Sequence, residues 1–444
     1  MKTLIRGGTV VTLGAGNVVV EGDLLIEGSR IVAVGKVSSR ALAGGGPVRL
    51  VDAAGCAVMP GFVQAHVHLC QALFRGMADD LPLLTWLRER VWPLEAAHDE
   101  ASLAASAELG LLEMMCAGTT TILDMGTVHA YDAVFDACAR AGIRCFGGKT
   151  MMDTGDGVPE GLSESTEESL RESDRLRETW TNKGEGRLGY AYAPRFILSC
   201  TERLFRETAE RSRSTGARLH SHIAEHPDER TAVRHALGKD DLALLRDYGF
   251  FGPKTLLAHG VQLRDEEMDV LASDGTRIVH CPSANLKLGS GIARVRDLDT
   301  RGVVVAMGAD GAPCNNNMDP WMELRHAALL AKLKNSTTSL PARRALRLAT
   351  IDGARALGID DQTGSLEVGK LADVAVVRLD APHVEPGGDV FSRLVYACTA
   401  RDVDHVFVSG DWVVRHGEHR RLDRDVVLGR ARAQSRKLVA RAGL

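Results

Sequence analysis

Eight short apolar segments alternate with longer helical patterns through the middle of the chain, and this repeat constrains the fold more than any other feature. The expected strands span 62–69, 119–125, 143–151, 187–196, 218–225, 255–261, 277–285 and 303–311. Strands that alternate with helices run parallel and are joined by crossover helices. Eight such units over about 300 residues predict an α/β protein built on a (β/α)8 barrel with insertions.

Glycine-punctuated, β-rich segments flank this expected barrel at both ends of the chain. Neither end has enough strands to bury a face alone, so we expect the two ends to pair into one small β-sandwich. The predicted units are a sandwich from 1–58 and 363–421, a barrel from 59–362 and a C-terminal helix from 422–444. That basic last helix is expected to dock on the surface of the fold.

Two segments have the sequence pattern of helices. In 99–118, Asp99 is a good N-cap and Gly118 a good residue for the position after the C-cap. The segment 165–180 is a charged amphipathic helix. Its charges are interpreted as a solvated face rather than as a binding site.

The charge balance excludes some classes of partner. With 54 basic and 58 acidic residues the net charge is −4, which gives no general attraction to nucleic acid or to anionic membranes. No apolar run reaches transmembrane length and the first residues do not resemble a signal peptide. The nine cysteines form no C-x-x-C pair, so neither a disulfide framework nor a thiolate zinc site is expected. We therefore expect a cytoplasmic protein.

His66 and His68 stand one residue apart at the end of the first expected barrel strand. Side chains at i and i+2 of a strand share one face, and one face of a barrel strand points inward. The carboxyl ends of barrel strands carry the active sites of such enzymes. Paired imidazoles also occur on exposed strands, but these two follow a strand of buried type, which favours a metal site.

Other expected strands end in the same residue types. The residues at these other strand ends are His220, His222, Glu225, His259, His280 and Asp310. Nitrogen and oxygen ligands without thiolates suit zinc, with iron(II) as second choice. Three histidines and one aspartate would leave room for a water molecule, which a catalytic metal site requires.

Several motifs together resemble those of the amidohydrolase superfamily. They include "PGFVQAHVH", "GTTTILDM", "HIAE", "HCPSANLKLGSG" and "GADGAPCNNNMD". The chain looks most like the branch that contains 5-methylthioadenosine/S-adenosylhomocysteine deaminases and triazine chlorohydrolases. The resemblance covers nearly the whole length, and it implies a barrel with a second β-unit and a homo-oligomer.

The resemblance also implies a set of metal ligands, namely His66, His68, His222 and Asp310. Relatives with two metals use a lysine on the fourth strand, and 187–196 has none, so one divalent metal per subunit is implied. His220 is then interpreted as a core histidine.

The remaining polar residues receive catalytic roles through the same resemblance. Asp310 would accept a proton from water, Glu225 would deliver protons to the substrate, and His259 would stabilise the attacking oxygen. His280 matches a histidine that lines the pocket. Glu225 could instead be a carboxylate that complements a helix dipole, but its spacing from His222 favours catalysis.

The motifs disagree about the substrate. Glu95 falls where adenosine-type deaminases place a glutamate on the ribose hydroxyls, and a carboxylate suits a cis-diol. Gln71, Arg195 and Phe196 instead resemble the residues with which guanine deaminases hold the base. Phe196 could also be simple packing, and Arg195 a loop ion pair.

Three hypotheses for function follow. The favoured one is a metal-dependent deaminase that converts 5′-deoxyadenosine, methylthioadenosine or S-adenosylhomocysteine to the inosine analogue and ammonia. The second is a guanine or other purine deaminase, or a triazine chlorohydrolase. The third, a non-catalytic scaffold, is disfavoured because a scaffold has no reason to keep a buried charge cluster.

Overall fold

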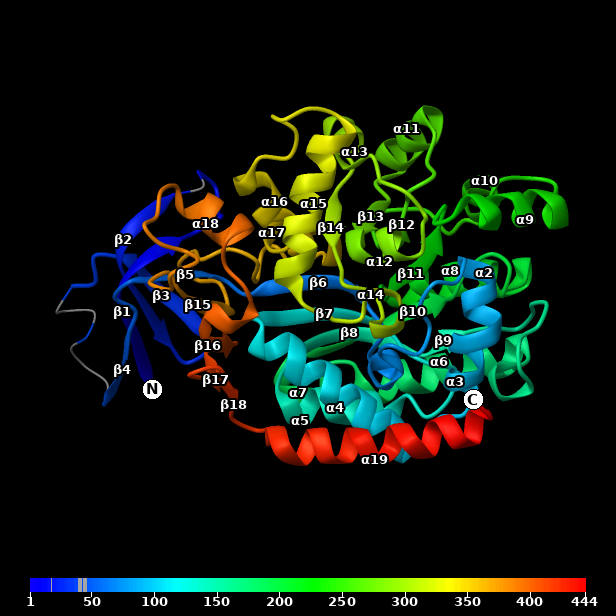
Figure 1. The fold of residues 1–444 in the computed structure, drawn as a ribbon, viewed down its shortest axis with the longest axis horizontal. Coiled ribbons are helices and arrows are strands. Elements are labelled where there is room, and N and C mark those ends of the chain that lie inside the picture. Colours follow the sequence, from blue (N-terminus) through cyan, green and yellow to red (C-terminus); the bar gives the residue numbers. More distant parts are fainter. Residues whose placement is uncertain (17, 39–41, 43–45) are drawn as a thin grey trace.

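The computed structural model describes residues 1–16, 18–38, 42 and 46–444. Two strand-containing units lie beside one another along the long axis of the molecule (Figure 1). One unit is a barrel surrounded by helices, and the other is a sheet that combines strands from both ends of the chain. The predicted fold class is therefore confirmed.

The barrel is closed and its strands are parallel. Its strands in spatial order are β6 (Phe62–Val67), β7 (Thr119–Met125), β8 (Arg144–Gly148), β10 (Leu188–Pro194), β11 (Arg218–Ile223), β12 (Thr255–His259), β13 (Arg277–His280) and β14 (Val305–Met307). Pairing of Met307 with Gln64 joins the last strand to the first. A short strand, β9 (Thr150–Met151), continues beside the end of β10. Parallel strands place all their carboxyl ends at one mouth of the barrel.

Most expected strands are shorter in the structure than in the sequence prediction, and the last two are shortened most. The strand expected over 277–285 ends at His280, because Pro282 begins a helix, α12 (Pro282–Lys287). Proline at the first turn of a helix costs no hydrogen bond, whereas it cannot donate to a central strand. The strand expected over 303–311 is confined to β14.

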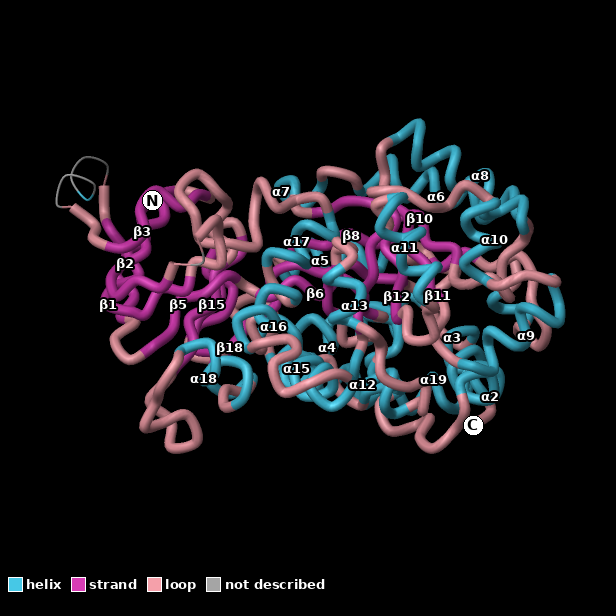
Figure 2. Tube along the Cα trace, turned by 90° about the horizontal axis from the view of Figure 1, so that it is seen from above, coloured by secondary structure: helices cyan, strands magenta, loops and turns pink. Residues whose placement is uncertain are grey.

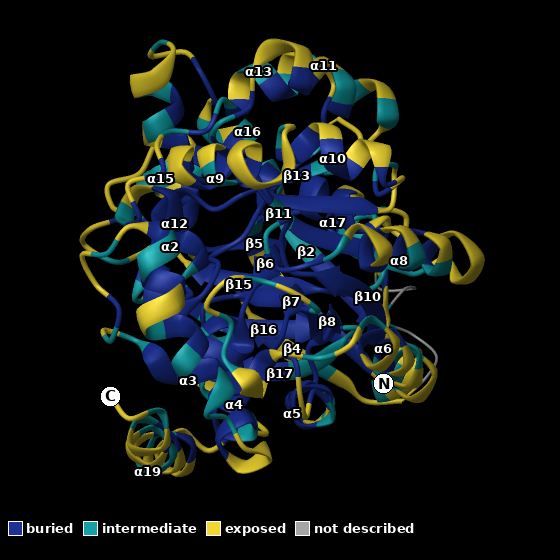
Figure 3. Cartoon of the chain, turned by 90° about the vertical axis from the view of Figure 1, so that its right-hand side faces the viewer, coloured by how far each residue is buried: buried dark blue, intermediate teal, exposed yellow. Residues whose placement is uncertain are grey.

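Helices cover the outside of the barrel, so that the strands in its interior are buried (Figure 3). Those after β6 and β7 are η1 (Leu69–Phe74), α2 (Leu83–Trp86), η2 (Leu87–Val91), α3 (Trp92–Ala96), α4 (Glu100–Cys116) and α5 (Asp132–Ala141). Those between β9 and β13 are η3 (Glu160–Leu162), α6 (Thr166–Trp180), α7 (Lys183–Gly186), α8 (Glu202–Thr215), α9 (Pro227–Leu237), α10 (Asp241–Asp247) and α11 (Asp265–Asp274). The last are α13 (Val295–Thr300), α14 (Ala312–Asn315), α15 (Pro320–Lys334), α16 (Ala342–Leu348) and α17 (Ile351–Leu357).

The second unit is one continuous mixed sheet (Figure 2). Its N-terminal strands are β1 (Lys2–Val11), β2 (Val19–Glu27), β3 (Arg30–Gly35), β4 (Val48–Asp52) and β5 (Cys56–Pro60). Its C-terminal strands are β15 (Val374–Arg378), β16 (Val403–Val408), β17 (Asp411–Arg415) and β18 (Glu418–His419). Antiparallel pairing of β5 with β15 joins the two ends. Side chains from both ends, among them Ile5, Val58, Val374 and Phe407, form one core. The divisions expected after residues 58, 362 and 421 remain predictions.

The helix ends follow the chemistry expected of them. Asp99 accepts the backbone N–H of Ser102 at 2.8 Å and so caps α4, while Gly118 has a φ of +97° just beyond its C-terminus.

The remaining helices are α18 (Val390–Tyr396), η4 (Ala400–Asp402) and α19 (Arg424–Ala442). As predicted, α19 lies on the surface, where it packs against α3, α4 and η1. In the part of the chain that the structure describes, no helix combines the length and apolarity needed to cross a membrane.

Candidate active site

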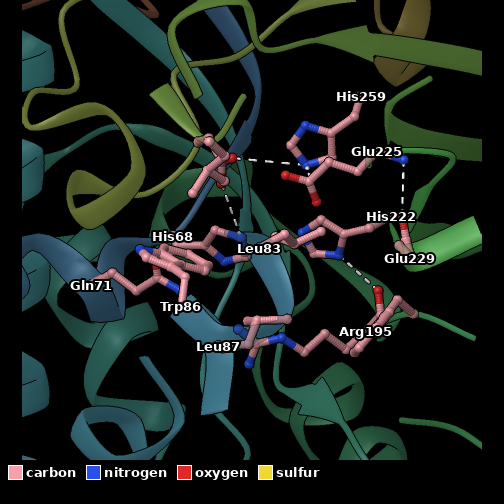
Figure 4. Close-up of a pocket in the computed structure, with 13 residues that line it drawn as sticks. His68, Gln71, Leu83, Trp86, Leu87, Arg195, His222, Glu225, Glu229 and His259 are labelled. Carbon is pink, nitrogen blue, oxygen red and sulfur yellow. Dashed lines mark hydrogen bonds and ion pairs between the residues drawn. The ribbon is translucent and has the colours of Figure 1, made fainter. Parts of the chain in front are cut away.

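A pocket opens at the carboxyl ends of the barrel strands, where the sequence predicted it. Figure 4 shows polar side chains from several strands converging on it. Its lining comprises His68, Gln71, Leu83, Trp86, Leu87, Arg195, Phe196, His222, Glu225, Glu229, His259, Leu288 and Asp310. Imidazoles, carboxyl groups and a guanidinium thus share one cavity with several apolar side chains.

The four predicted metal ligands lie together. Oδ1 of Asp310 lies 3.3 Å from Nε2 of His66 and 3.3 Å from Nε2 of His68. His66 and His222 also present ring nitrogens within 4.8 Å of each other. Neighbouring ligands of a tetrahedral zinc ion with bonds of about 2.0–2.1 Å are separated by about 3.3 Å. The two 3.3 Å spacings and the nitrogen and oxygen donors therefore fit a zinc ion.

Each ligand histidine is oriented through its other ring nitrogen. Nδ1 of His68 donates to the carbonyl oxygen of Met125, and Nδ1 of His222 donates to that of Arg195, both at 2.7 Å. Nδ1 of His66 instead lies 2.7 Å from Nε2 of His220. A metal-binding histidine usually holds a partner through its second nitrogen in this way, which leaves the first nitrogen bare for the ion.

Two carboxyl groups in the pocket have pKa values shifted in opposite directions. Burial raises the pKa of Glu225 well above its usual value, and the charge of Asp310 raises it further. Burial also acts to raise the pKa of Asp310, but the nearby imidazoles of His66, His259 and His68 hold it well below its usual range. Such a divergence is the pattern of a paired general acid and general base.

His259 lies between these two carboxyl groups. Its Nε2 is 3.5 Å from Oε2 of Glu225 and 3.8 Å from Oδ2 of Asp310, while its Nδ1 donates to Oδ1 of Asn285 at 2.9 Å. His259 and Asp310 both adopt left-handed backbone conformations, with φ of +75° and +63°. Such conformations are uncommon for residues other than glycine and cluster at functional sites.

The backbone of Glu225 is held by a residue that the sequence reasoning missed. Oε2 of Glu229 accepts the backbone N–H of Glu225 at 3.0 Å, and Figure 4 shows this contact beside the pocket. Glu229 lies in the first turn of α9, four residues after Glu225. The signal in the sequence that could have indicated Glu229 is this spacing of four residues from Glu225, which was itself predicted to be catalytic.

The predicted substrate residues form a cluster of their own. Nη1 of Arg195 donates to Oε2 of Glu95 at 2.5 Å, and Nε2 of Gln71 donates to Oε1 of Glu95 at 2.7 Å. Arg195 and Gln71 line the pocket, whereas Glu95 lies behind them and is only 2% exposed. The carboxylate of Glu95 is therefore shared between these two side chains rather than open to the cavity.

The apolar lining was only partly predicted. Phe196 lines the pocket as expected, but Trp86, Leu87 and Leu288 were not anticipated. His280 ends β13 and is buried, yet it is not among the residues that line the pocket. Burial and the neighbouring His259 lower its pKa to about 3, so it is a neutral side chain beneath the site.

Comparison with known sequences gives consistent matches over the full length. The model of the amidohydrolase family matches residues 57–413. The 5-methylthioadenosine/S-adenosylhomocysteine deaminase of Halobacterium salinarum is 38% identical over 444 residues, which cover 99% of this chain and 98% of that protein. The 5′-deoxyadenosine deaminase of Methanothermobacter thermautotrophicus is 37% identical over 436 residues, which cover 98% of each protein.

Solved structures agree with these matches. An adenosine deaminase from Xanthomonas campestris with bound zinc has a TM-score of 0.92 and 32% identity, covering 99% of this chain and 98% of that one. The zinc complex of atrazine chlorohydrolase from Arthrobacter aurescens has a TM-score of 0.90 and 26% identity, covering 98% of this chain and all of that one (100%). The resemblance inferred from the motifs is confirmed.

Proposed function

Because the chain belongs to the amidohydrolase family, we propose that it is a zinc-dependent hydrolytic deaminase acting on a 5′-modified adenosine, with 5′-deoxyadenosine and methylthioadenosine as first candidates. Water would replace the amino group of the purine to give the inosine analogue and ammonia. The observation that carries the proposal is the placement of Glu225 and Asp310 in one pocket with His259 between them. The names of the full-length relatives support the choice of an adenosine compound.

His66, His68, His222 and Asp310 are the residues that would hold the ion. The family is metal-dependent, and zinc suits these nitrogen and oxygen donors, with iron(II) as second choice. A zinc ion held there would lower the pKa of water to about 7 and so would supply hydroxide at neutral pH.

The carboxyl groups would move the protons. Asp310, whose pKa is held low, accepts a proton from the attacking water. Glu225, whose pKa is raised, donates a proton to the ring nitrogen next to the reacting carbon, which favours addition of oxygen there. Asp310 then passes the proton it took from water to the amino group, so that the C–N bond breaks and ammonia leaves. The hydroxyl proton on the same ring carbon returns to Glu225 as the C=O bond forms. His259, between the two carboxyl groups, holds the attacking oxygen.

The remaining lining suits a planar heterocycle. Phe196 and Trp86 supply aromatic surface, and the guanidinium of Arg195 offers a flat set of donors. Glu95, which was predicted to contact the ribose hydroxyls, is not open to the cavity. Since Glu95 binds Arg195 and Gln71, its influence on substrate would pass through these two side chains.

One observation favours a second candidate, a deaminase of a free purine base such as guanine. Gln71 and Arg195 line the pocket, whereas Glu95 does not. A chlorohydrolase is less well supported, because the retained pair of Glu225 and Asp310 suits the loss of an amine, which has to be protonated as it leaves.

The test is ammonia release by zinc-loaded protein. The substrates are 5′-deoxyadenosine, methylthioadenosine, S-adenosylhomocysteine, adenosine and guanine, with chloride release from a chlorotriazine measured beside them. We expect turnover of the adenosine compounds and its loss in Glu225→Gln, which keeps the shape of the side chain but cannot donate the proton. Turnover of guanine alone would overturn the proposed substrate.

A further inference from the structure

His220 connects the predicted ligand His66 to the backbone of the next strand. It lies on β11, fully buried, two residues before His222. Its Nδ1 is 2.9 Å from the carbonyl oxygen of Leu256, and its Nε2 is 2.7 Å from Nδ1 of His66. A carbonyl oxygen only accepts, so Nδ1 of His220 carries a hydrogen. In the neutral ring Nε2 is then an acceptor, and it accepts the Nδ1–H of His66.

This chain of contacts leaves Nε2 of His66 without a hydrogen. That atom is buried and makes no hydrogen bond, although it lies 3.3 Å from Oδ1 of Asp310. A buried nitrogen lone pair without a partner is costly unless something binds it. The ligand atoms of His68 and Asp310, two of the other expected ligands, lie within 4.8 Å of a ring nitrogen of His66.

In the other two expected ligand histidines, Nε2 is left without a hydrogen because Nδ1 donates directly to a backbone carbonyl oxygen. Nδ1 of His68 donates directly to Met125, and Nδ1 of His222 donates directly to Arg195. Only His66, among the three, has a side chain rather than a carbonyl group as its partner. The imidazole of His220 therefore accepts the Nδ1–H of His66, as a backbone carbonyl oxygen accepts the Nδ1–H of His68 and of His222.

We propose that His220 is a positioning residue that fixes the tautomer of His66 and so presents the Nε2 lone pair of His66 to the zinc site. The inference rests on the proposed metal site and replaces the earlier interpretation of His220 as a core histidine. Without an acceptor at this position, either nitrogen of His66 can hold the proton, and only one of the two forms can bind the ion. Loss of such an outer partner typically weakens metal affinity by about 10–100-fold.

The variants His220→Gln and His220→Leu separate this role from simple packing. Glutamine can accept from His66 through Oε1 and donate to Leu256 through Nε2, whereas leucine fills space and can do neither. The zinc dissociation constant is measured by competition with a chromophoric chelator. We expect His220→Leu to bind zinc about 10–100-fold more weakly than the wild type and His220→Gln to stay within about threefold.

A buried histidine far from the pocket supplies the control. His419→Leu in the mixed sheet removes an imidazole that is 8% exposed and is expected to leave zinc affinity unchanged. Wild-type affinity in His220→Leu, or equal weakening in His220→Gln and His220→Leu, would overturn the proposal.

The tautomer itself can be read without any variant. In metal-free wild-type protein labelled with ¹⁵N-histidine, two-bond ¹H–¹⁵N spectra distinguish a protonated from a bare ring nitrogen. We expect His66 to carry its hydrogen on Nδ1, and a hydrogen on Nε2 would overturn the proposal even if His220→Leu failed to fold. A wild-type protein that binds zinc but releases no ammonia would count against the proposed reaction alone, so the two ideas fail separately.

Discussion

The guanidinium of Arg195 and the carboxylate of Glu95 form an ion pair at 2.5 Å in which both side chains are at most 4% exposed. The two residues lie 100 positions apart in the chain, Glu95 on α3 and Arg195 just after β10. Gln71 completes the cluster by donating to the same carboxylate. A wall of the pocket is thus held to the helix behind it by an almost fully buried charge pair.

Removing one partner of this pair is expected to destabilise the protein. Glu95→Gln should lower the free energy of unfolding by about 3–5 kcal/mol, because it leaves the Arg195 charge buried and unpaired. The double variant Glu95→Gln/Arg195→Met, which removes both charges, should recover part of that loss. Urea denaturation measures both values. Equal losses in the single and double variants would contradict a coupled pair.

The same substitution should act on substrate binding rather than on the chemical step. We expect Glu95→Gln to raise KM for 5′-deoxyadenosine more than for adenine, with kcat changed only a few-fold, since Glu95 touches none of the proton-transferring groups. Steady-state kinetics on both compounds provide the comparison. A similar rise in KM for adenine would mean that Glu95 acts through the base and not through the ribose.

Metal removal should lower stability as well as activity. A zinc concentration a thousandfold above its dissociation constant stabilises the folded state by about 4 kcal/mol, because the unfolded chain lacks the assembled ligands. Thermal unfolding with and without a chelator should therefore differ in Tm. His68→Gln supplies the control, in which this difference should shrink. Identical melting curves for the wild type under both conditions would argue against a metal at this site.

Gly308 is expected to tolerate no side chain. A Cβ at this position would overlap the carbonyl oxygen of His66 and lie 2.9 Å from its backbone nitrogen. Gly308→Ala should therefore displace β6, with loss of both Tm and zinc affinity. Gly429→Ala on α19, where a Cβ meets nothing within 4 Å, should be neutral or stabilising by up to about 1 kcal/mol. Equal behaviour of the two variants would refute the argument.

Asp124 should make stability depend on pH. It accepts hydrogen bonds from the backbone N–H of Leu69 and the hydroxyl of Tyr131, and burial raises its pKa from 3.8 to about 6. The folded state therefore binds the proton more tightly than the unfolded state, and this contribution, complete below pH 3.8, is lost as pH rises to about 6.

The variant Asp124→Asn tests this sign, because asparagine keeps the shape and carries no charge. Relative to the wild type, it should become more stable as pH rises from 4 to 7, by an amount on the order of 3 kcal/mol. Urea denaturation at the two pH values measures the change. A difference that is independent of pH would show that Asp124 does not titrate in this range.

The strand pattern predicted the barrel and the position of its polar ends. Alternation along a strand is enough to place His66 and His68 on one face, and parallel strands bring their ends to one mouth. Contacts between distant segments were not accessible in this way. Nothing in the spacing of Glu95 and Arg195 indicates that they touch, because helix α3 reaches β10 only through the tertiary fold.

Tautomers are a second class of information that residue types do not carry. His220 was interpreted as part of the core because its position, one strand period before His222, lies deeper in the barrel. Its two ring nitrogens acquire their roles only from the atoms they meet, Leu256 on one side and His66 on the other. The pattern indicates where an imidazole lies, but its neighbours decide which nitrogen is free.

The packing of α19 has a consequence for how the protein is made. This helix covers Leu73, Phe74 and Leu94, in the segment that carries Gln71 and Glu95, and Arg441 donates to the carbonyl oxygen of Ala97 at 2.8 Å. A ribosome adding about 5–20 residues per second needs some tens of seconds to pass from that segment to α19. Until α19 has been synthesised, these apolar side chains therefore lack the helix that covers them in the finished fold.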